Sequence, residues 1–388
     1  MEQVSDVRIM PRFKTSVVLS AGLAMFWARL GSLNALENVS TCRLLKKWVR
    51  SRVPSADTMG RVFAAMDTAG LRKALHHIYS RLKRNKALLK FAGSTVAVLD
   101  GHETHASYRR HCQGCLQRTI HTQDGDRIQY YHRNVTLMLV SPKLRLLIDV
   151  EPQRKGEDEV GAALRLLKRV LRTYPRAFQV ILADALYASA PFINFLWAHR
   201  KYCLVVLKDA RRDIYQDALA LFKLQPGQIG RYRGRNCLWF DISDFTSWPQ
   251  VIAPLRIVRS QESYLVYRQA TKQSVRETTE WLWLTNLPAS LASTERIVQL
   301  GHARWDIENY GFNELVNGWH ADHVYRHDPT AIEAFYLTAF LAFNLFHAFL
   351  TLNVKPALRY TKTDSFWARA LTSEIYGETS EYALIRAP

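Results

Sequence analysis

The chain has 388 residues, enough for about two or three domains and a sizeable hydrophobic core. Hydrophobic residues make up 48% of it and charged residues 22%, a balance that excludes an intrinsically disordered chain. The 53 lysines and arginines against 34 acidic residues give a formal net charge of +19, so the first partner to expect is a polyanion. Because the cations are spread along the chain, nucleic acid is favoured over a membrane surface, and a merely basic soluble protein is the alternative.

Two apolar stretches, residues 17–30 and 331–350, raise the question of a membrane. Arg29 interrupts the first stretch, and no small-residue cleavage site of a signal peptide follows it. The second contains three polar side chains that would be costly in a bilayer: Glu333, Asn344 and His347. Both stretches are therefore predicted to be buried helices of the fold.

The N-terminal quarter of the chain has helical patterning only, with helices predicted over residues 15–36, 41–52, 55–67 and 70–90. Pro54 would end the second helix and Ser55 or Asp57 would cap the third, a spacing that indicates a helix-turn-helix. Three packed helices with a basic surface are an equal alternative. The many cations of residues 72–90 nevertheless favour a helical DNA-binding domain over residues 1–92. Three cations flank the turn where phosphate contacts would lie: Arg50, Arg52 and Arg61.

After Gly93 the pattern changes to the short buried strand STVAVLD, which ends at the carboxylate of Asp100. Two more strands are predicted over residues 130–140 and 144–150, joined as a hairpin. A helix follows over residues 156–174. Its acidic start is interpreted as helix capping more than catalysis, a reading that covers Glu157, Asp158 and Glu159.

The strand QVILA, residues 179–183, repeats the pattern and ends at Asp184. A helix over residues 188–199 and a strand over 202–207 then complete a mixed sheet covered by helices. From residue 208 to about 287, short strands alternate with turns, which predicts a β-rich insertion before the helical pattern resumes at Ser293.

The helix after the insertion carries a third carboxylate. Arg304 and Glu308 are four residues apart and share a helical face, and taken alone they are most simply a surface ion pair. Joined with Asp100 and Asp184, Glu308 would complete a set of three hard oxygen donors suited to Mg²⁺ or Mn²⁺. A pair of such ions stabilises the attacking and leaving oxygens of a phosphodiester displacement.

Three segments resemble the DDE transposases of IS4-like insertion sequences: VLDG with Asp100, LADALY with Asp184 and Tyr187, and RWDIENYGF with Arg304 and Glu308. The resemblance covers most of the chain and implies an α/β fold with an RNase H-like core. It implies two Mg²⁺ ions bound by Asp100, Asp184 and Glu308, and DNA contacts by Arg304 and Tyr187. It also implies cleavage at the terminal inverted repeats, joining of the 3′-hydroxyl to target DNA, a homodimer in the synaptic complex, and a bacterial cytoplasmic location at the nucleoid.

The chain departs from the Tyr-(2)-Arg-(3)-Glu-(6)-Lys signature of that family, because Gly301 and Leu315 stand at the tyrosine and lysine positions. Trp305 could stack on an unpaired base at the transposon end, whereas packing in the core is the commoner role of tryptophan. A metal-dependent DNA nuclease and a catalytically silent DNA-binding relative are the alternative functions. The lysine contact would pass to residues just beyond the helix, although a polar loop is an equal reading of them: His320, His323, Arg326 and His327.

The predicted organisation has five parts. A helical DNA-binding domain covers residues 1–92, and the RNase H-like core is split into 93–207 and 291–355. The β-rich insertion covers residues 208–290 and a C-terminal tail covers 356–388.

The five cysteines are odd in number and scattered, which favours a reducing cytoplasm over a disulfide framework. Cys112 and Cys115 form a Cys-x2-Cys pair with the spacing of zinc ligands, but no second such pair completes it. A structural zinc ion is one interpretation, and a reduced pair with histidines facing DNA beside Arg109, Arg110 and Arg118 is the other. The nearby histidines are His102, His105, His111 and His121.

Overall fold

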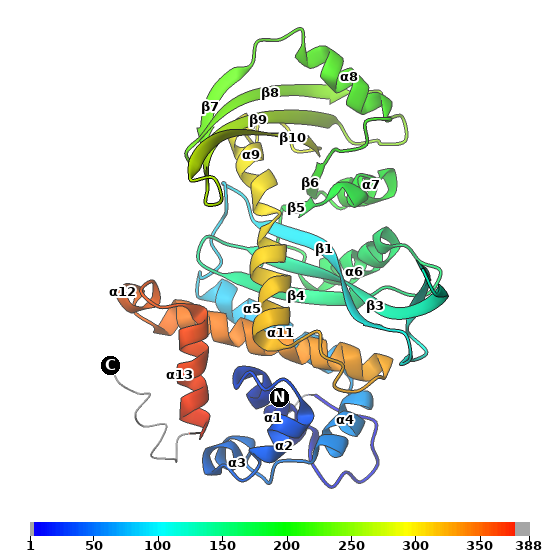
Figure 1. The fold of residues 1–388 in the computed structure, drawn as a ribbon, viewed down its shortest axis with the longest axis vertical. Helices are drawn as coiled ribbons and strands as arrows, with labels where there is room; N and C mark the ends of the chain where they lie inside the picture. The colour runs from blue at the N-terminus through cyan, green and yellow to red at the C-terminus, as the bar shows by residue number, and fades with distance from the viewer. Residues whose placement is uncertain (1–3, 377–388) are drawn as a thin grey trace.

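The computed structural model describes residues 4–376 (Figure 1). Within these residues the strands form one ten-stranded sheet in the order β2-β3-β1-β5-β6-β10-β9-β8-β7, and β4 pairs with β3. The strands are β1 Val96–Ser107, β2 Leu116–Thr122, β3 Gly125–Val140, β4 Arg145–Pro152, β5 Val180–Ala183, β6 Tyr202–Val206, β7 Gln228–Tyr232, β8 Arg235–Phe245, β9 Leu255–Arg268 and β10 Gln273–Thr285.

Helices cover the sheet and form the N-terminal part of the described chain. They are α1 Thr15–Trp27, α2 Leu33–Asn38, α3 Arg43–Val49, α4 Ala56–Ala64, α5 Thr68–Arg84, α6 Glu159–Thr173, α7 Ala190–Ala198, α8 Asp213–Phe222, α9 Thr294–Ala303, α10 Asn313–Trp319, α11 Pro329–Asn353, α12 Pro356–Arg359 and α13 Asp364–Tyr376. A 3₁₀ turn, η1 Ala185–Tyr187, follows β5, and a π-helical turn, η2 Glu308–Phe312, precedes α10. The predicted tail thus includes α12 and α13, and its residues 377–388 lie outside the described chain.

Five strands in the order β4-β3-β1-β5-β6 form the centre of the fold. β1 runs antiparallel to β3 and parallel to β5, and β5 runs parallel to β6. The fully buried runs Val96–Leu99 and Val180–Ala183 are the apolar patterns expected of central strands with both faces covered. A mixed α/β fold with a helix-covered sheet, as predicted, is confirmed, and it is consistent with an RNase H-like core.

The β-rich region after β6 continues the same sheet. Trp283, Leu284 and Thr285 of β10 pair antiparallel with β6, and β9, β8 and β7 follow as hairpins. Figure 1 shows these four strands curving away above the central strands. The edge of β6 that a five-stranded core would leave open is therefore covered by backbone hydrogen bonds.

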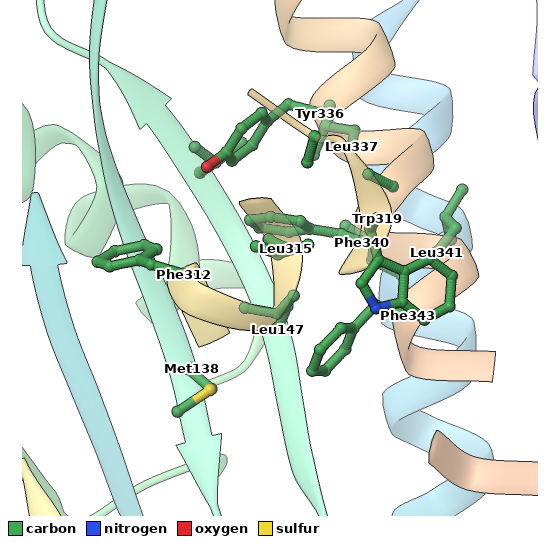
Figure 2. Close-up of a cluster of buried hydrophobic side chains, with 14 of the residues drawn as sticks. Met138, Leu147, Phe312, Leu315, Trp319, Tyr336, Leu337, Phe340, Leu341 and Phe343 are labelled. Atoms are coloured by element: carbon green, nitrogen blue, oxygen red, sulfur yellow. The ribbon is translucent and has the colours of Figure 1, made fainter. Parts of the chain in front are cut away.

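Helix α11 lies between the sheet and the N-terminal helices (Figure 1). It is the one described helix long and apolar enough to span a membrane, but 67% of its most apolar window is buried within the fold. α1 packs against α11. The single helix predicted over residues 15–36 proved wrong, because Arg29 adopts a left-handed φ of 55° that separates α1 from α2. Figure 2 shows the core between α11, the η2–α10 segment and the sheet, formed by Met138, Leu147, Phe312, Leu315, Trp319, Phe340 and Phe343.

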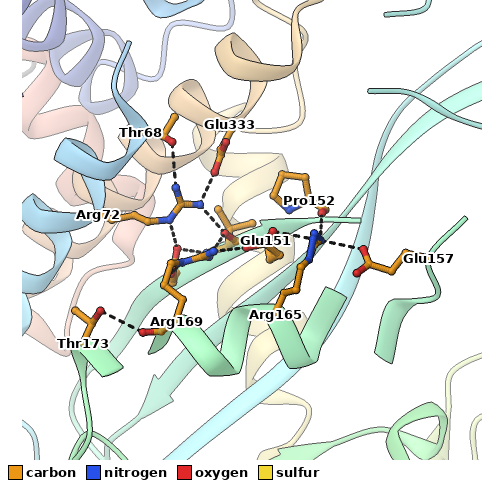
Figure 3. Close-up of polar contacts among 11 residues, drawn as sticks. Thr68, Arg72, Glu151, Pro152, Glu157, Arg165, Arg169, Thr173 and Glu333 are labelled. Atoms are coloured by element: carbon orange, nitrogen blue, oxygen red, sulfur yellow. Dashed lines mark hydrogen bonds and ion pairs between the residues drawn. The ribbon is translucent and has the colours of Figure 1, made fainter. Parts of the chain in front are cut away.

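Buried and half-buried charges near the start of α11 are paired across elements (Figure 3). Arg72 of α5 donates to Asp149 at 2.9 Å and also pairs with Glu333 of α11. Arg169 of α6 donates to Asp149 at 2.7 Å and pairs with Glu151. The network thus fixes α5, α6 and α11 to strand β4, and it explains how a charged residue is accommodated near the start of the apolar helix α11.

Candidate active site

Two of the predicted carboxylates lie on adjacent parallel strands. β1 and β5 pair with Val96 opposite Val180 and Val98 opposite Leu182, and the same offset carried two residues further places Asp100 level with Asp184. Neighbouring strands are about 4.8 Å apart, so the two side chains share one end of the parallel pair. Asp184 is also the N-cap of η1, where its Oδ1 accepts a hydrogen bond from the Leu186 amide at 2.9 Å.

Arg304 links the third carboxylate, Glu308, to Asp100. The Nη1 atom of Arg304 lies 2.7 Å from Glu308 Oε1 and 3.7 Å from Asp100 Oδ2. Glu308 opens the π-helical turn η2, and such turns occur mostly as single insertions in α-helices, often at functional sites. Arg304 is only 7% exposed and lies over the Trp305 ring at 4.3 Å, so its guanidinium is held in place.

The Asp100 carboxyl group has a raised pKa. Burial raises its pKa to about 7, the negative charges of Asp184 and Glu308 act in the same direction, and Arg304 and the Gly101 amide oppose them. Burial and the neighbouring carboxylates thus disfavour the negative charge of Asp100 more than Arg304 and the Gly101 amide favour it. A divalent cation would relieve this charge, and three half-buried carboxylates offer the hard oxygen ligands that Mg²⁺ prefers, so the donor set fits that ion.

Helix α9, which leads into Arg304, is anchored by the β-rich region. His302 Nε2 lies 2.7 Å from Glu262 of β9, which also accepts a hydrogen bond from Arg235 at 2.8 Å. A Cβ atom at Gly301 would lie 2.2 Å from the Trp283 ring, so the tyrosine of the family signature has no room at this position. Leu315 is fully buried in the core of Figure 2, where a lysine would be an unpaired charge. Both departures from the signature thus have packing explanations.

Glu159 is a site residue that the sequence interpretation missed. It was assigned to helix capping, but Asp158 is the N-cap of α6, and Glu159 is buried and accepts a hydrogen bond from the Tyr187 hydroxyl at 2.8 Å. Arg133 donates to its other oxygen at 3.1 Å. The missed signal was periodicity, because Glu159 begins the apolar face that continues through Ala162, Ala163, Leu166, Leu167 and Val170.

The residues predicted to contact DNA occupy different environments. Tyr187 is fully buried, and its hydroxyl donates a hydrogen bond to Glu159 instead of facing DNA. Trp305 is 38% exposed and meets Trp281 edge-on, which makes it partly a packing residue and partly an accessible one. Arg50, Arg52 and Arg61 are exposed around the turn between α3 and α4.

The predicted cysteine pair lies apart from the carboxylates. Cys112 and Cys115 have Sγ atoms 3.7 Å apart, and both approach His132. The histidines named from the sequence are engaged elsewhere: His102 stacks on Phe312, His111 stacks on Tyr130, His121 contacts Asp126 at 2.6 Å, and His105 lies against the His132 ring without a described contact to either cysteine.

Comparison with known proteins gives one family assignment. No curated protein matches the chain. A family model described as "Transposase DDE domain" matches residues 92–345, a range that begins before β1 and includes Asp100, Asp184 and Glu308. The match covers well over half of the sequence and all the elements that form the carboxylate site, so this chain belongs to the DDE transposase domain family.

Proposed function

We propose that the chain is the DNA transposase of an IS4-like insertion sequence, which cuts the transposon ends and joins the freed 3′-hydroxyl to target DNA. The observation that carries this proposal is the convergence of Asp100, Asp184 and Glu308, with Arg304 bridging the first and the last. Their order along the chain, with a β-rich region before the glutamate, supports the IS4-like assignment. The net charge of +19 supports a DNA substrate.

Metal binding follows from the same donor set. Asp100, Asp184 and Glu308 would hold two Mg²⁺ ions, or Mn²⁺, which supply charge stabilisation for the attacking and leaving oxygens of the phosphodiester displacement. Arg304 lies near Asp100 and Glu308, which supports a role in contacting the phosphate next to the cleaved bond. Glu159 and Tyr187 act as positioning residues, because their hydrogen bond fixes the segment that follows Asp184.

The N-terminal helices would supply the DNA-binding surface. α3 ends at Val49, and Arg50, which follows it, has a left-handed φ of 56°. At the start of α4 the Ser55 hydroxyl accepts a hydrogen bond from the Thr58 amide at 3.4 Å. These ends define the turn of the predicted helix-turn-helix, flanked by Arg50, Arg52 and Arg61. We further propose a homodimer on paired inverted repeats, acting in the cytoplasm at the nucleoid.

Cleavage of a supercoiled plasmid carrying the inverted repeats that flank the gene tests the proposal. The wild-type chain is expected to nick this DNA with Mg²⁺ but not with EDTA. Asp100→Asn, Asp184→Asn and Glu308→Gln should each reduce the rate by about a thousandfold or more, since each removes a charge from the metal ligands. Asp217→Asn, an exposed aspartate of α8, is the matched control and should retain full activity. Undiminished cleavage by all three carboxylate variants would overturn the assignment.

A strand-transfer assay separates the proposed transposase from a nuclease on the same core. Precut ends with a free 3′-hydroxyl are incubated with a target plasmid and Mg²⁺, and joined products are scored. A transposase yields joined products that disappear with Glu308→Gln, whereas a nuclease yields cleavage without joining. A silent DNA-binding relative would bind the ends and yield neither product.

A further inference from the structure

Four metal-ligating side chains meet at the end of the sheet beyond the carboxylate site. Cys112 Sγ lies 3.3 Å and Cys115 Sγ 3.2 Å from His132 Nε2. Cys115 Sγ also lies 3.2 Å from His327 Nε2, and the two sulfurs are 3.7 Å apart. All four ligand atoms lie within 4.8 Å of one another.

These spacings are those of a tetrahedral zinc site. With Zn–S bonds of about 2.3 Å and Zn–N bonds of about 2.0 Å, tetrahedral angles separate two sulfurs by about 3.8 Å and a sulfur from a nitrogen by about 3.5 Å. The sulfur–sulfur distance of 3.7 Å agrees with this, and the sulfur–nitrogen distances of 3.2 to 3.3 Å are slightly shorter. Two thiolates with two imidazoles are also the soft donor set that selects zinc over Mg²⁺.

The local backbone supports the cysteine pair. The Cys112 amide donates to Cys115 Sγ at 3.2 Å, and the Cys115 amide donates to the Cys112 carbonyl at 3.2 Å, which closes the Cys-x2-Cys turn. Cys115 and His132 are buried, with 2% and 6% exposure, while Cys112 and His327 are half-buried. Both cysteines are free thiols in the structure, so neither is lost to a disulfide.

We propose that Cys112, Cys115, His132 and His327 bind one structural zinc ion. All four tetrahedral positions are filled by protein, so the ion has no open position for a substrate or water and serves the fold. The inference goes beyond the proposed transposase reaction and does not depend on it.

The ion would join segments far apart in the sequence. Cys112 and Cys115 lie in the turn between β1 and β2, and His132 lies in β3 opposite Thr104 of β1. His327 comes from the segment between α10 and α11, and a Cβ at Gly114 would lie 3.1 Å from Pro329, the first residue of α11. Zinc would thus fix the segment between α10 and α11 to β3 and to the turn after β1, the strand that carries Asp100, and it would link Cys115 to His327 across 212 residues of sequence.

The metal content of the untagged full-length chain tests the proposal. Protein purified without chelators should contain about one zinc ion per chain by elemental analysis. Zinc replaced by Co²⁺ should give the intense visible bands of a tetrahedral site together with thiolate-to-metal charge transfer in the near ultraviolet. A wild-type chain with less than about a tenth of an equivalent of zinc and no tetrahedral Co²⁺ spectrum would overturn the proposal.

Single-ligand variants identify the ligands. Cys115→Ser and His327→Asn should each weaken zinc binding by about a hundredfold or more, since each removes a direct ligand. His121→Asn, an exposed histidine of β2, is the control and should bind zinc like wild type. His327→Asn changes a half-buried side chain, so it tests the site even if Cys115→Ser does not fold. Wild-type affinity in His327→Asn would overturn the assignment of this ligand set, and because no DNA is present, the result is independent of cleavage activity.

Discussion

At the scale of single residues, the surroundings of Asp100 disfavour the charged form of its carboxyl group. Its pKa in the folded chain is about 7, above its ordinary value of 3.8, so between these pH values the folded chain holds a proton that the unfolded chain has lost. The stability contributed by this proton is complete below pH 3.8 and is lost as the pH rises to about 7. A carboxylate with this cost in the free protein is one that cation binding would stabilise.

The first prediction concerns the free energy of unfolding of Asp100→Asn without divalent cations. The amide cannot ionise, so the variant should gain stability over wild type as the pH rises from 4 to 7, reaching about 2 to 4 kcal/mol at pH 8. Urea denaturation at pH 5 and pH 8 measures the difference, and Asp217→Asn serves as the exposed control. Saturating Mg²⁺ should stabilise wild type at pH 8 and the variant much less. Equal stability of the two chains at both pH values would show that Asp100 does not carry this charge penalty.

Gly101 is the second residue-scale test, because it has no space for a side chain. A Cβ atom there would lie 2.3 Å from the Glu159 carboxylate, which is held by Tyr187 and Arg133. Gly101→Ala should therefore displace Glu159, cost about 1 to 3 kcal/mol of stability and lower the cleavage rate. Gly31→Ala, where the nearest atom of His320 lies at an ordinary 3.7 Å, should be nearly neutral in both measurements.

A double-mutant cycle identifies the cause of the Gly101→Ala effect. Glu159→Ala removes the side chain that the new methyl group would meet, so Gly101→Ala should cost much less in that background than in wild type. Additive free energies of unfolding would mean that the alanine acts on something other than Glu159. The comparison uses urea denaturation of four chains and does not require activity.

At the scale of elements, α11 and β4 are joined by one buried amide. The Leu147 amide donates to Asn344 Oδ1 at 2.9 Å, and Asn344 Nδ2 donates to the Leu147 carbonyl at 2.7 Å. Asn344 therefore pairs with the backbone at the outer edge of β4 as another strand would, which explains a polar residue in the middle of an apolar helix.

The third prediction is that Asn344→Ala destabilises the fold by about 2 to 4 kcal/mol, since it leaves two buried backbone groups of Leu147 without partners. Hydrogen exchange of the Leu147 amide should speed up with it. Asn317→Ala, an exposed asparagine of α10, should change stability by less than about 0.5 kcal/mol. A neutral Asn344→Ala with an unchanged Leu147 exchange rate would remove this account of the α11–β4 contact.

Strands formed by an unbroken run of buried apolar residues could be predicted from the sequence. Elements that depend on hydrogen bonding to a neighbouring strand, or on a change of the helical repeat, could not. The strands ending at Asp100 and Asp184 were visible because four apolar residues precede each carboxylate. The extension of β1 to Ser107 and the whole of β2 were missed, because nearly all of their side chains are half-buried or exposed and hydrogen bonding to β3 creates the strands. The π-helical turn at Glu308 is only five residues long, too short for a repeat of apolar residues that would distinguish it from an α-helix. The sequence therefore predicted an uninterrupted helix.

At the scale of the whole molecule, contacts between residues far apart in the sequence determine which side chains share a site. Arg304 and Glu308 alone indicate a surface ion pair, and only the fold brings Asp100 to within 3.7 Å of Arg304. His132 and His327 could not be chosen as partners of the cysteines, because nearer histidines competed for the role in the sequence. The domain boundaries at residues 208 and 290 stay predictions, and β10 pairs with β6 so that the two regions share one sheet.

The last prediction concerns which of the cations behind the net charge of +19 contact DNA phosphates. If the turn between α3 and α4 contacts phosphates, replacing Arg50, Arg52 and Arg61 by alanine should weaken DNA binding. The slope of log K against log salt should fall in magnitude by about 2 to 3, since each phosphate contact contributes about 0.9. Fluorescence anisotropy with a short duplex at several salt concentrations measures both quantities.

The matched control for this prediction removes the same charge from another part of the molecule. Replacing Arg211, Arg231 and Arg276, three exposed arginines of the β-rich region, also lowers the net charge by three, from +19 to +16. A change in long-range attraction alone would affect both triple variants equally, because it depends on net charge. Direct phosphate contacts at the α3–α4 turn would instead reduce the slope in the first triple much more than in the second, so equal slopes in the two triples would contradict a DNA-binding turn there.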